Sequence, residues 1–176
     1  MVETVSALSY FFCAAFMLFI GGWAYVKKYH YCFMLVLIFG MREMDFDKRF
    51  TTMGMLKSKF YVSPDVSLIE KAIGLIVISV ILYIAFRLIK SHSRTFIGSV
   101  LKLSPAHIAI FLAVAFAFIS KTLDGITRKL GDIGITVNQN LTIHFEALEE
   151  IIELGIPVML TLAVYFFLRK AHHANS

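Results

Sequence analysis

The most concentrated chemistry in the sequence is a group of four glutamates near the carboxyl end. They are Glu146, Glu149, Glu150 and Glu153. At 100° per residue their side chains fall within about 100° of arc, so an α-helix would carry all four on one face. Carboxylates this close repel one another, so some must be protonated, paired with cations or bound to a metal ion. Pro157 removes the usual donor to the Glu153 carbonyl, and a free carbonyl beside a carboxylate suits a cation.

Further charged side chains follow two earlier apolar stretches. Arg42, Glu43 and Asp45 come at the end of one, and Asp124 and Arg128 follow another. We expect these groups to lie at the same membrane level as the glutamates, where opposite charges can pair. The candidate charged site therefore comprises Arg42, Glu43, Asp45, Asp124, Arg128, Glu146, Glu149, Glu150 and Glu153. Glu149, Glu150 and Glu153 are the candidate ligands of a divalent metal ion, the one cofactor that the pattern suggests.

Composition indicates what must position these residues. Of the 176 residues, 59% are hydrophobic and only 16% are charged, which is far from the balance of a soluble domain. Five nearly uncharged stretches account for the excess, and with their flanks they approach the roughly 20 helical residues that cross a bilayer. Spans are predicted at residues 5–26, 29–45, 65–89, 105–121 and 146–168. Little chain remains for another module, so we expect one integral membrane domain over residues 1–176.

We therefore expect an all-helical bundle of about five transmembrane helices. Local sequence signals indicate where some of its helices begin. Ser63-Pro64 and Ser104-Pro105 each place a capping hydroxyl before a proline, which is typical of a helix start. Residues 46–61 carry apolar side chains at helical spacing with basic residues among them. This pattern predicts an amphipathic helix in the membrane interface.

Charge also predicts an orientation. With five spans, one side of the membrane receives basic residues and no acidic residue, and the other side receives all twelve carboxylates. The acid-free side carries Lys27, Lys28, Arg87, Lys90, Arg94, Lys102, Arg169 and Lys170. Its connections are shorter and its positive charge denser, so we assign it to the cytoplasm. The amino terminus is then outside and the carboxyl terminus cytoplasmic, and the cytoplasmic (inner) membrane of a bacterium is the favoured location.

The sequence limits the function classes without naming a reaction. Its net charge of +5 comes from residues that flank membrane spans, which favours lipid phosphates over nucleic acid as partners. No zinc-protease, serine-hydrolase or glycine-rich phosphate motif is present.

Three hypotheses use the charged extracytoplasmic face. In the first, the face binds a cation, an anionic lipid headgroup or a partner subunit, in a binding, transport or assembly role. In the second, the same carboxylates serve a membrane-embedded, metal-dependent hydrolase or transferase acting on lipid. In the third, the charges form an ion-pair network in a structural subunit. Membrane lipids and a membrane-protein partner or a second copy of the chain are the expected partners.

Overall fold

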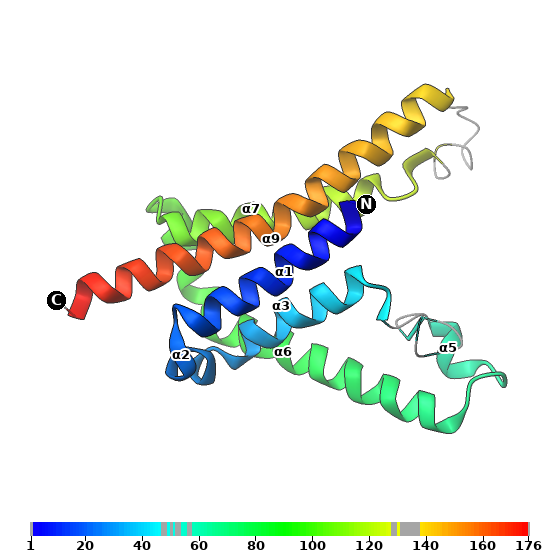
Figure 1. The fold of residues 1–176 in the computed structure, drawn as a ribbon, viewed down its shortest axis with the longest axis horizontal. Helices are drawn as coiled ribbons and strands as arrows, with labels where there is room; N and C mark the ends of the chain where they lie inside the picture. The colour runs from blue at the N-terminus through cyan, green and yellow to red at the C-terminus, as the bar shows by residue number, and fades with distance from the viewer. Residues whose placement is uncertain are drawn as a thin grey trace. The chain divides into compact units, whose positions relative to one another are not determined.

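The computed structural model describes residues 2–46, 49, 51, 54–55, 58–127, 130 and 138–175, and within them it contains helices and no strand. The prediction of an all-helical chain is therefore confirmed for the described residues. The helices are α1 (Val2–Phe19), α2 (Gly22–Lys28), α3 (His30–Glu43), α5 (Ser58–Val62), α6 (Leu68–Leu101), α7 (Pro105–Leu123) and α9 (Gln139–Asn175), drawn in Figure 1.

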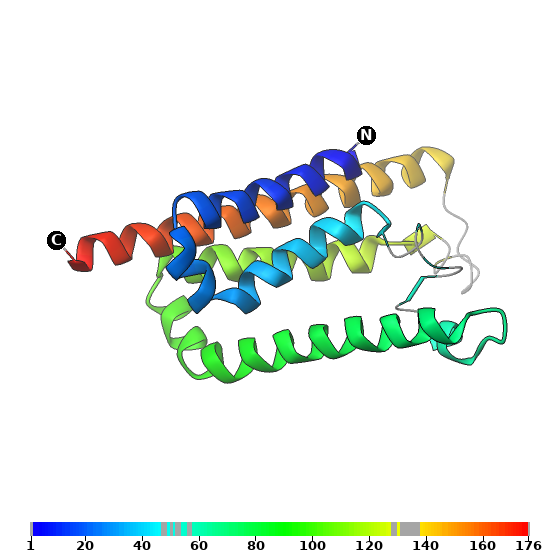
Figure 2. The same cartoon turned by 60° about the horizontal axis from the view of Figure 1, so that its bottom comes forward.

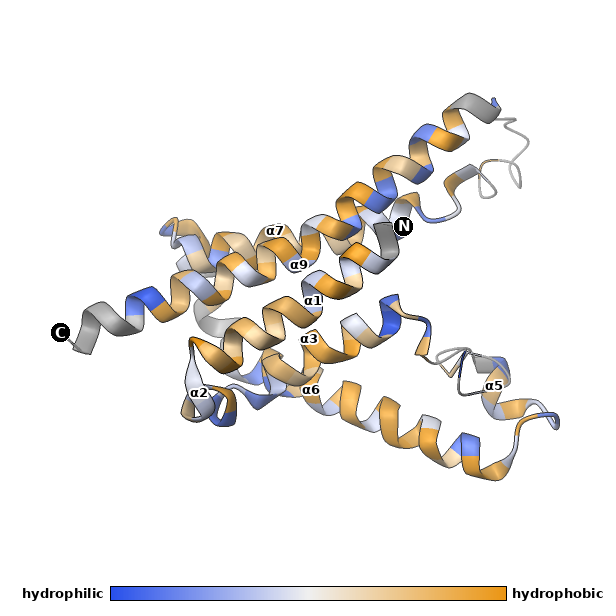
Figure 3. Ribbon diagram, viewed as in Figure 1, coloured by the Kyte–Doolittle hydropathy of each residue, from blue (hydrophilic) through white to orange (hydrophobic). Residues whose placement is uncertain are grey.

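Three of these helices are long and apolar enough to cross a membrane. The qualifying segments are Leu68–Ser91 of α6, Pro105–Leu123 of α7 and Leu141–Lys170 of α9. Hydrophobic residues cover α6 and α7 along most of their length, whereas the first half of α9 also carries hydrophilic positions (Figure 3). These segments correspond to the last three predicted spans, and they indicate an integral membrane protein built from helices.

The first predicted span is not one straight helix. Within residues 5–26, α1 ends at Phe19 and α2 begins at Gly22, and the two helices meet at an angle of 113°. Gly22 has φ of 74°, a left-handed conformation that a residue with a side chain rarely adopts, so the glycine permits the bend. A fourth crossing exists only if this bent pair counts as one span.

The second predicted span, 29–45, is a shorter helix than expected. Helix α3 ends at Glu43, and Met44 and Asp45 form a turn in which Asp45 has φ of 51°. Its 14 residues extend about 21 Å at 1.5 Å per residue, less than the hydrocarbon thickness of about 30 Å. The turn places Asp45 outside the helix that carries Arg42 and Glu43.

The interfacial helix predicted over residues 46–61 is interrupted in the described part of that range. Thr51 lies in a bend, Gly54 is not helical and Met55 lies in a turn, before the short helix α5 begins at Ser58. Glycine favours such a break because it loses more conformational freedom in a helix than any other residue.

Helix α6 begins after the Ser63-Pro64 signal rather than at it. The Glu70 N–H donates to Ser67 Oγ at 3.3 Å, and the Ser67 hydroxyl donates to Glu70 Oε1 at 3.2 Å. Ser67 is therefore the N-cap, because its hydroxyl accepts from the Glu70 N–H, and this sets the helix start at Leu68. By contrast, α7 begins at Pro105 with Ser104 at the N-cap position, as the sequence predicts. The Ser104 hydroxyl makes no capping hydrogen bond and lies 3.0 Å from His107 Nδ1 instead.

The chain forms two compact units, one of Met1–Ser9 with Gly98–Ser176 and one of Tyr10–Ile97. The prediction of a single membrane domain stays a prediction. In the first unit α7 and α9 lie side by side, with the closest backbone packing between helices in the described chain (Figure 2). Helix α7 turns a stripe of small side chains inward, namely Ala106, Ala109, Ala113 and Ser120. Small residues let two membrane helices approach closely.

Gly155 is the corresponding small residue on α9. A Cβ atom added there would lie 2.8 Å from the Phe116 ring, closer than real Cβ contacts. Gly155 therefore makes room on α9 for the Phe116 ring of α7, which a larger side chain would have to displace.

We expect Gly155→Leu to lower the free energy of unfolding in detergent by about 1–3 kcal/mol, because the added side chain overpacks the contact with Phe116. Gly98→Leu is the matched control, since a Cβ atom at Gly98 meets nothing within 4 Å. Thermal unfolding followed by circular dichroism compares the two variants. Equal stability of both variants would contradict the close approach.

Candidate functional site

The four predicted glutamates all lie on α9, in the turns before Pro157. Glu146 and Glu150 are exposed, whereas Glu149 and Glu153 are half-buried. The face that the sequence predicts therefore has two parts, one turned towards the protein and one turned away from it. Only the first part takes its partners from within the chain.

Glu153 is held by α7. Ser120 is 4% exposed, and its hydroxyl donates to Glu153 Oε1 at 2.8 Å. A hydrogen bond from a buried hydroxyl to a carboxylate is favourable, because neither group is then left unsatisfied at membrane depth. Sequence reasoning missed Ser120, although it continues the helical stripe of Ala106, Ala109 and Ala113 that marks the inward face of α7.

The end of α7 adds two charges beside the same face. Lys121 forms an ion pair with Asp124, which caps the helix, and both side chains are at least half exposed. Glu149 lies close enough to four charged groups to interact with them electrostatically: it is repelled by Asp124, Glu153 and Glu146 and attracted by Lys121. We call Lys121, Asp124, Glu146, Glu149 and Glu153 the α7–α9 charged cluster. Its formal charge is negative, because four carboxylates accompany one lysine.

The cluster brings together part of the predicted site. Glu150 is close in sequence but points outward, and Arg128 lies outside the described residues. Among the side chains that the structure describes, no three His, Cys, Asp or Glu residues are arranged to hold a metal ion. The predicted metal ligation by Glu149, Glu150 and Glu153 stays a prediction.

Arg42, Glu43 and Asp45 belong to the other compact unit, Tyr10–Ile97. They lie at the carboxyl end of α3, where the Asp45 N–H donates to the Arg42 carbonyl at 2.9 Å. Glu43 is half-buried, and Arg42 and Asp45 are exposed. Within the described residues, no carboxylate forms an ion pair with the Arg42 guanidinium.

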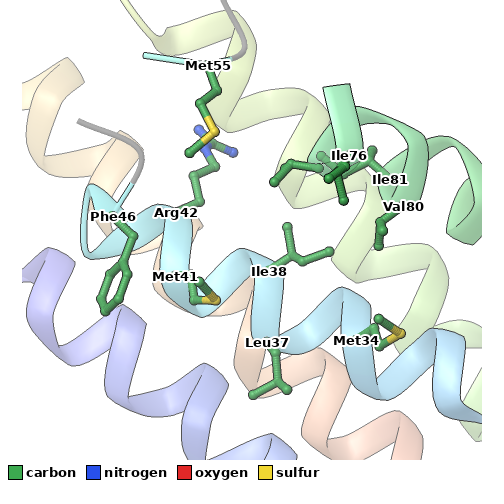
Figure 4. A pocket seen from close by; sticks show the side chains of 11 residues that line it. Met34, Leu37, Ile38, Met41, Arg42, Phe46, Met55, Ile76, Val80 and Ile81 are labelled. Carbon is green, nitrogen blue, oxygen red and sulfur yellow. The ribbon is translucent and has the colours of Figure 1, made fainter. Parts of the chain in front are cut away.

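Arg42 also borders a cavity of about 380 Å³ that the sequence analysis did not anticipate. Helix α3 and helix α6 form its two walls, and Phe46 and Met55 lie towards the Arg42 end (Figure 4). The other lining residues are Met34, Leu37, Ile38, Met41, Ile76, Val77, Val80 and Ile81. Arg42 is the one charged residue among them, and its side chain extends towards Met55 (Figure 4).

Side chains bridge α3 and α6 at the opposite end. His30 Nε2 lies 3.3 Å from the Tyr83 hydroxyl, and the rings of the two residues stack. The Arg87 guanidinium lies over the Tyr31 ring, 5.7 Å from its centroid. The two helices are thus joined by large polar and aromatic groups rather than by close backbone packing, and this leaves space further along.

Comparison of the chain with protein-family models, curated proteins and solved structures gives no match. The fold and the charged groups define a helical membrane protein, and the functional argument therefore rests on those groups.

The Ser120–Glu153 hydrogen bond can be tested with a double-mutant cycle of Ser120→Ala and Glu153→Ala. We expect a coupling energy of about 1–2 kcal/mol in unfolding, because each single substitution strands the other partner. The cycle of Ser120→Ala with Glu150→Ala serves as control, since Glu150 is exposed. Additive effects in the first cycle would show that the hydrogen bond contributes nothing.

Proposed function

We propose that the chain is a non-enzymatic membrane protein with a binding or assembly role, in which the α7–α9 charged cluster, together with the adjacent exposed Glu150, receives a cationic group. A basic side chain of a partner subunit is the ligand that the cluster fits best. The supporting observation is the excess of carboxylates over cations among the described residues at one end of a closely packed helix pair.

Charge balance gives the reason. Lys121 pairs with Asp124 and also attracts Glu149, so this one cation leaves most of the carboxylate charge of the cluster unbalanced among the described residues. Carboxylates near a bilayer are costly unless cations or hydrogen bonds compensate them. An approaching lysine or arginine would supply the missing positive charge, whereas an anionic lipid headgroup would be repelled.

The geometry favours a partner's side chain over a tightly held metal ion. A divalent ion needs several oxygens that converge on one point, and no such group of three is found among the described side chains. Glu146 and Glu150 instead point outward, where they are accessible to a second protein.

The proposal includes five crossings, with the amino terminus outside a bacterial inner membrane and the carboxyl terminus in the cytoplasm. The α1–α2 pair and α3 would cross in addition to α6, α7 and α9. The two added crossings are proposed together as a hairpin. With both of them, or with neither, the ends of the chain lie on opposite sides and the α7–α9 charged cluster lies outside, whereas crossing of the α1–α2 pair alone would put both ends on the same side.

Cysteine labelling in intact cells tests this topology. In a background without Cys13 and Cys32, Asp65→Cys is expected to react with a membrane-impermeant maleimide, and Lys102→Cys only after permeabilisation. Lys28→Cys reports on the hairpin, and we expect it to behave as Lys102→Cys does. Reaction of Lys28→Cys in intact cells would show that α3 does not cross, and reaction of Lys102→Cys there would reverse the orientation.

The partner hypothesis predicts that the wild-type chain, extracted from its own membranes in mild detergent, carries a second subunit at fixed stoichiometry. Glu146→Gln with Glu150→Gln should weaken this complex about three- to tenfold, because two exposed ion pairs are lost. Asp65→Asn, another exposed carboxylate, is the control. Native mass spectrometry gives the stoichiometry.

A stable wild-type monomer would contradict the assembly role. Elemental mass spectrometry of the same preparations addresses the metal alternative. If the wild type carries stoichiometric metal and Glu149→Gln does not, the ligand of the cluster is a metal ion rather than a partner's basic side chain.

A further inference from the structure

The cavity between α3 and α6 has the chemistry of an amphiphile site. Among the described residues its walls are apolar, and the one charged lining group is the Arg42 guanidinium at one end. We propose that the cavity binds one anionic phospholipid, with an acyl chain between α3 and α6 and the headgroup phosphate on Arg42. This site lies within the unit Tyr10–Ile97, and it is separate from the α7–α9 charged cluster.

The apolar walls come from regular faces of two helices. On α3, Met34, Leu37, Ile38 and Met41 recur at helical spacing, and Arg42 ends the series. On α6, Ile76, Val77, Val80 and Ile81 form the opposing wall. Water gains few hydrogen bonds in such a space, so a hydrocarbon chain is the occupant that the walls favour.

The cavity is accessible from the side on which lipid lies. Ile76 lines it and is 64% exposed, and the neighbouring α6 residues Ile73 and Leu75 are also exposed. Helix α6 is one of the three helices apolar enough to span the bilayer. An acyl chain can therefore enter laterally from the bilayer without crossing a polar surface.

The two ends of the cavity differ, and this sets the direction of the lipid. At one end, His30 with Tyr83 and Tyr31 with Arg87 bridge the helices. At the other end, α3 finishes and Arg42 extends its guanidinium beside Met55 (Figure 4). The methyl end of the chain thus points towards the bridged end, and the phosphate lies at the end of α3.

Charge complementarity favours an anionic lipid. Arg42 has no ion-pair partner among the described residues, so a phosphate can take both arms of its guanidinium. A zwitterionic lipid would bring a second cation to this end. Phosphatidylglycerol carries the phosphate without that cation.

The test uses the full chain in mild detergent, titrated with phosphatidylglycerol or with phosphatidylcholine of the same acyl chains, and followed by native mass spectrometry. The wild type should bind one phosphatidylglycerol in preference to phosphatidylcholine. Arg42→Gln should weaken phosphatidylglycerol binding about tenfold and remove the preference, because a charge-assisted hydrogen bond is lost. Val80→Trp, which fills the cavity, should weaken binding of both lipids.

Matched controls separate the cavity from general lipid contact. Lys59→Gln removes an exposed cation of α5 that does not line the cavity, and Leu82→Trp enlarges an exposed residue of α6 outside the lining. Both should bind phosphatidylglycerol as the wild type does. Glu146→Gln with Glu150→Gln should also bind normally, so failure of the assembly proposal leaves this one standing.

Two results would overturn the proposal. Unchanged phosphatidylglycerol binding by Arg42→Gln and by Val80→Trp would mean that lipid contacts the surface without a site. A dimer of the wild-type chain that dissociates with Val80→Trp would mean that a second copy occupies the cavity. Because Arg42 is exposed, Arg42→Gln should fold. The test therefore remains decisive even if Val80→Trp fails to fold.

Discussion

Side-chain size at the helix interfaces determines how this chain packs. In hydrocarbon, two helices gain little by exchanging lipid contacts for contacts with each other, so van der Waals fit and hydrogen bonds decide the distance between them. Where α7 presents alanines and Ser120, and α9 presents Gly155, the backbones come close. Where α3 and α6 present methionine, isoleucine and aromatic side chains, they remain apart and enclose a cavity.

The two kinds of packing place charge in different surroundings. Close packing of α7 and α9 brings Ser120 to Glu153, so a carboxylate finds a donor within the bundle. Looser packing of α3 and α6 leaves Arg42 beside apolar walls with no carboxylate of the described chain paired to it. A carboxylate with a donor inside the bundle and a basic group without an ion-pair partner among the described residues thus follow from the same property of their helices.

Composition predicts the helices that are long and apolar enough to cross a bilayer on their own, because the length of an apolar segment can be read from the local sequence. The predicted spans 65–89, 105–121 and 146–168 therefore correspond to qualifying segments of α6, α7 and α9. Residues 5–26 are predicted as one span because they are uncharged. Gly22, which allows a left-handed backbone there, was the signal against a straight helix, and hydropathy does not weigh it.

The same distinction applies to the candidate site: the sequence predicts which residues are neighbours on one helix, but not which residues meet between two helices. Helical spacing alone places Glu146, Glu149 and Glu153 near one another, since they are neighbours on one helix. Ser120 was also visible on a small-residue stripe, but its pairing with Glu153 depends on how α7 meets α9. The cavity beside Arg42 depends on the separation of two helices about forty residues apart in the chain. A sequence pattern gives the face of each helix but not the distance between two faces, and that distance decides whether Arg42 belongs to a solvated rim or to a binding site.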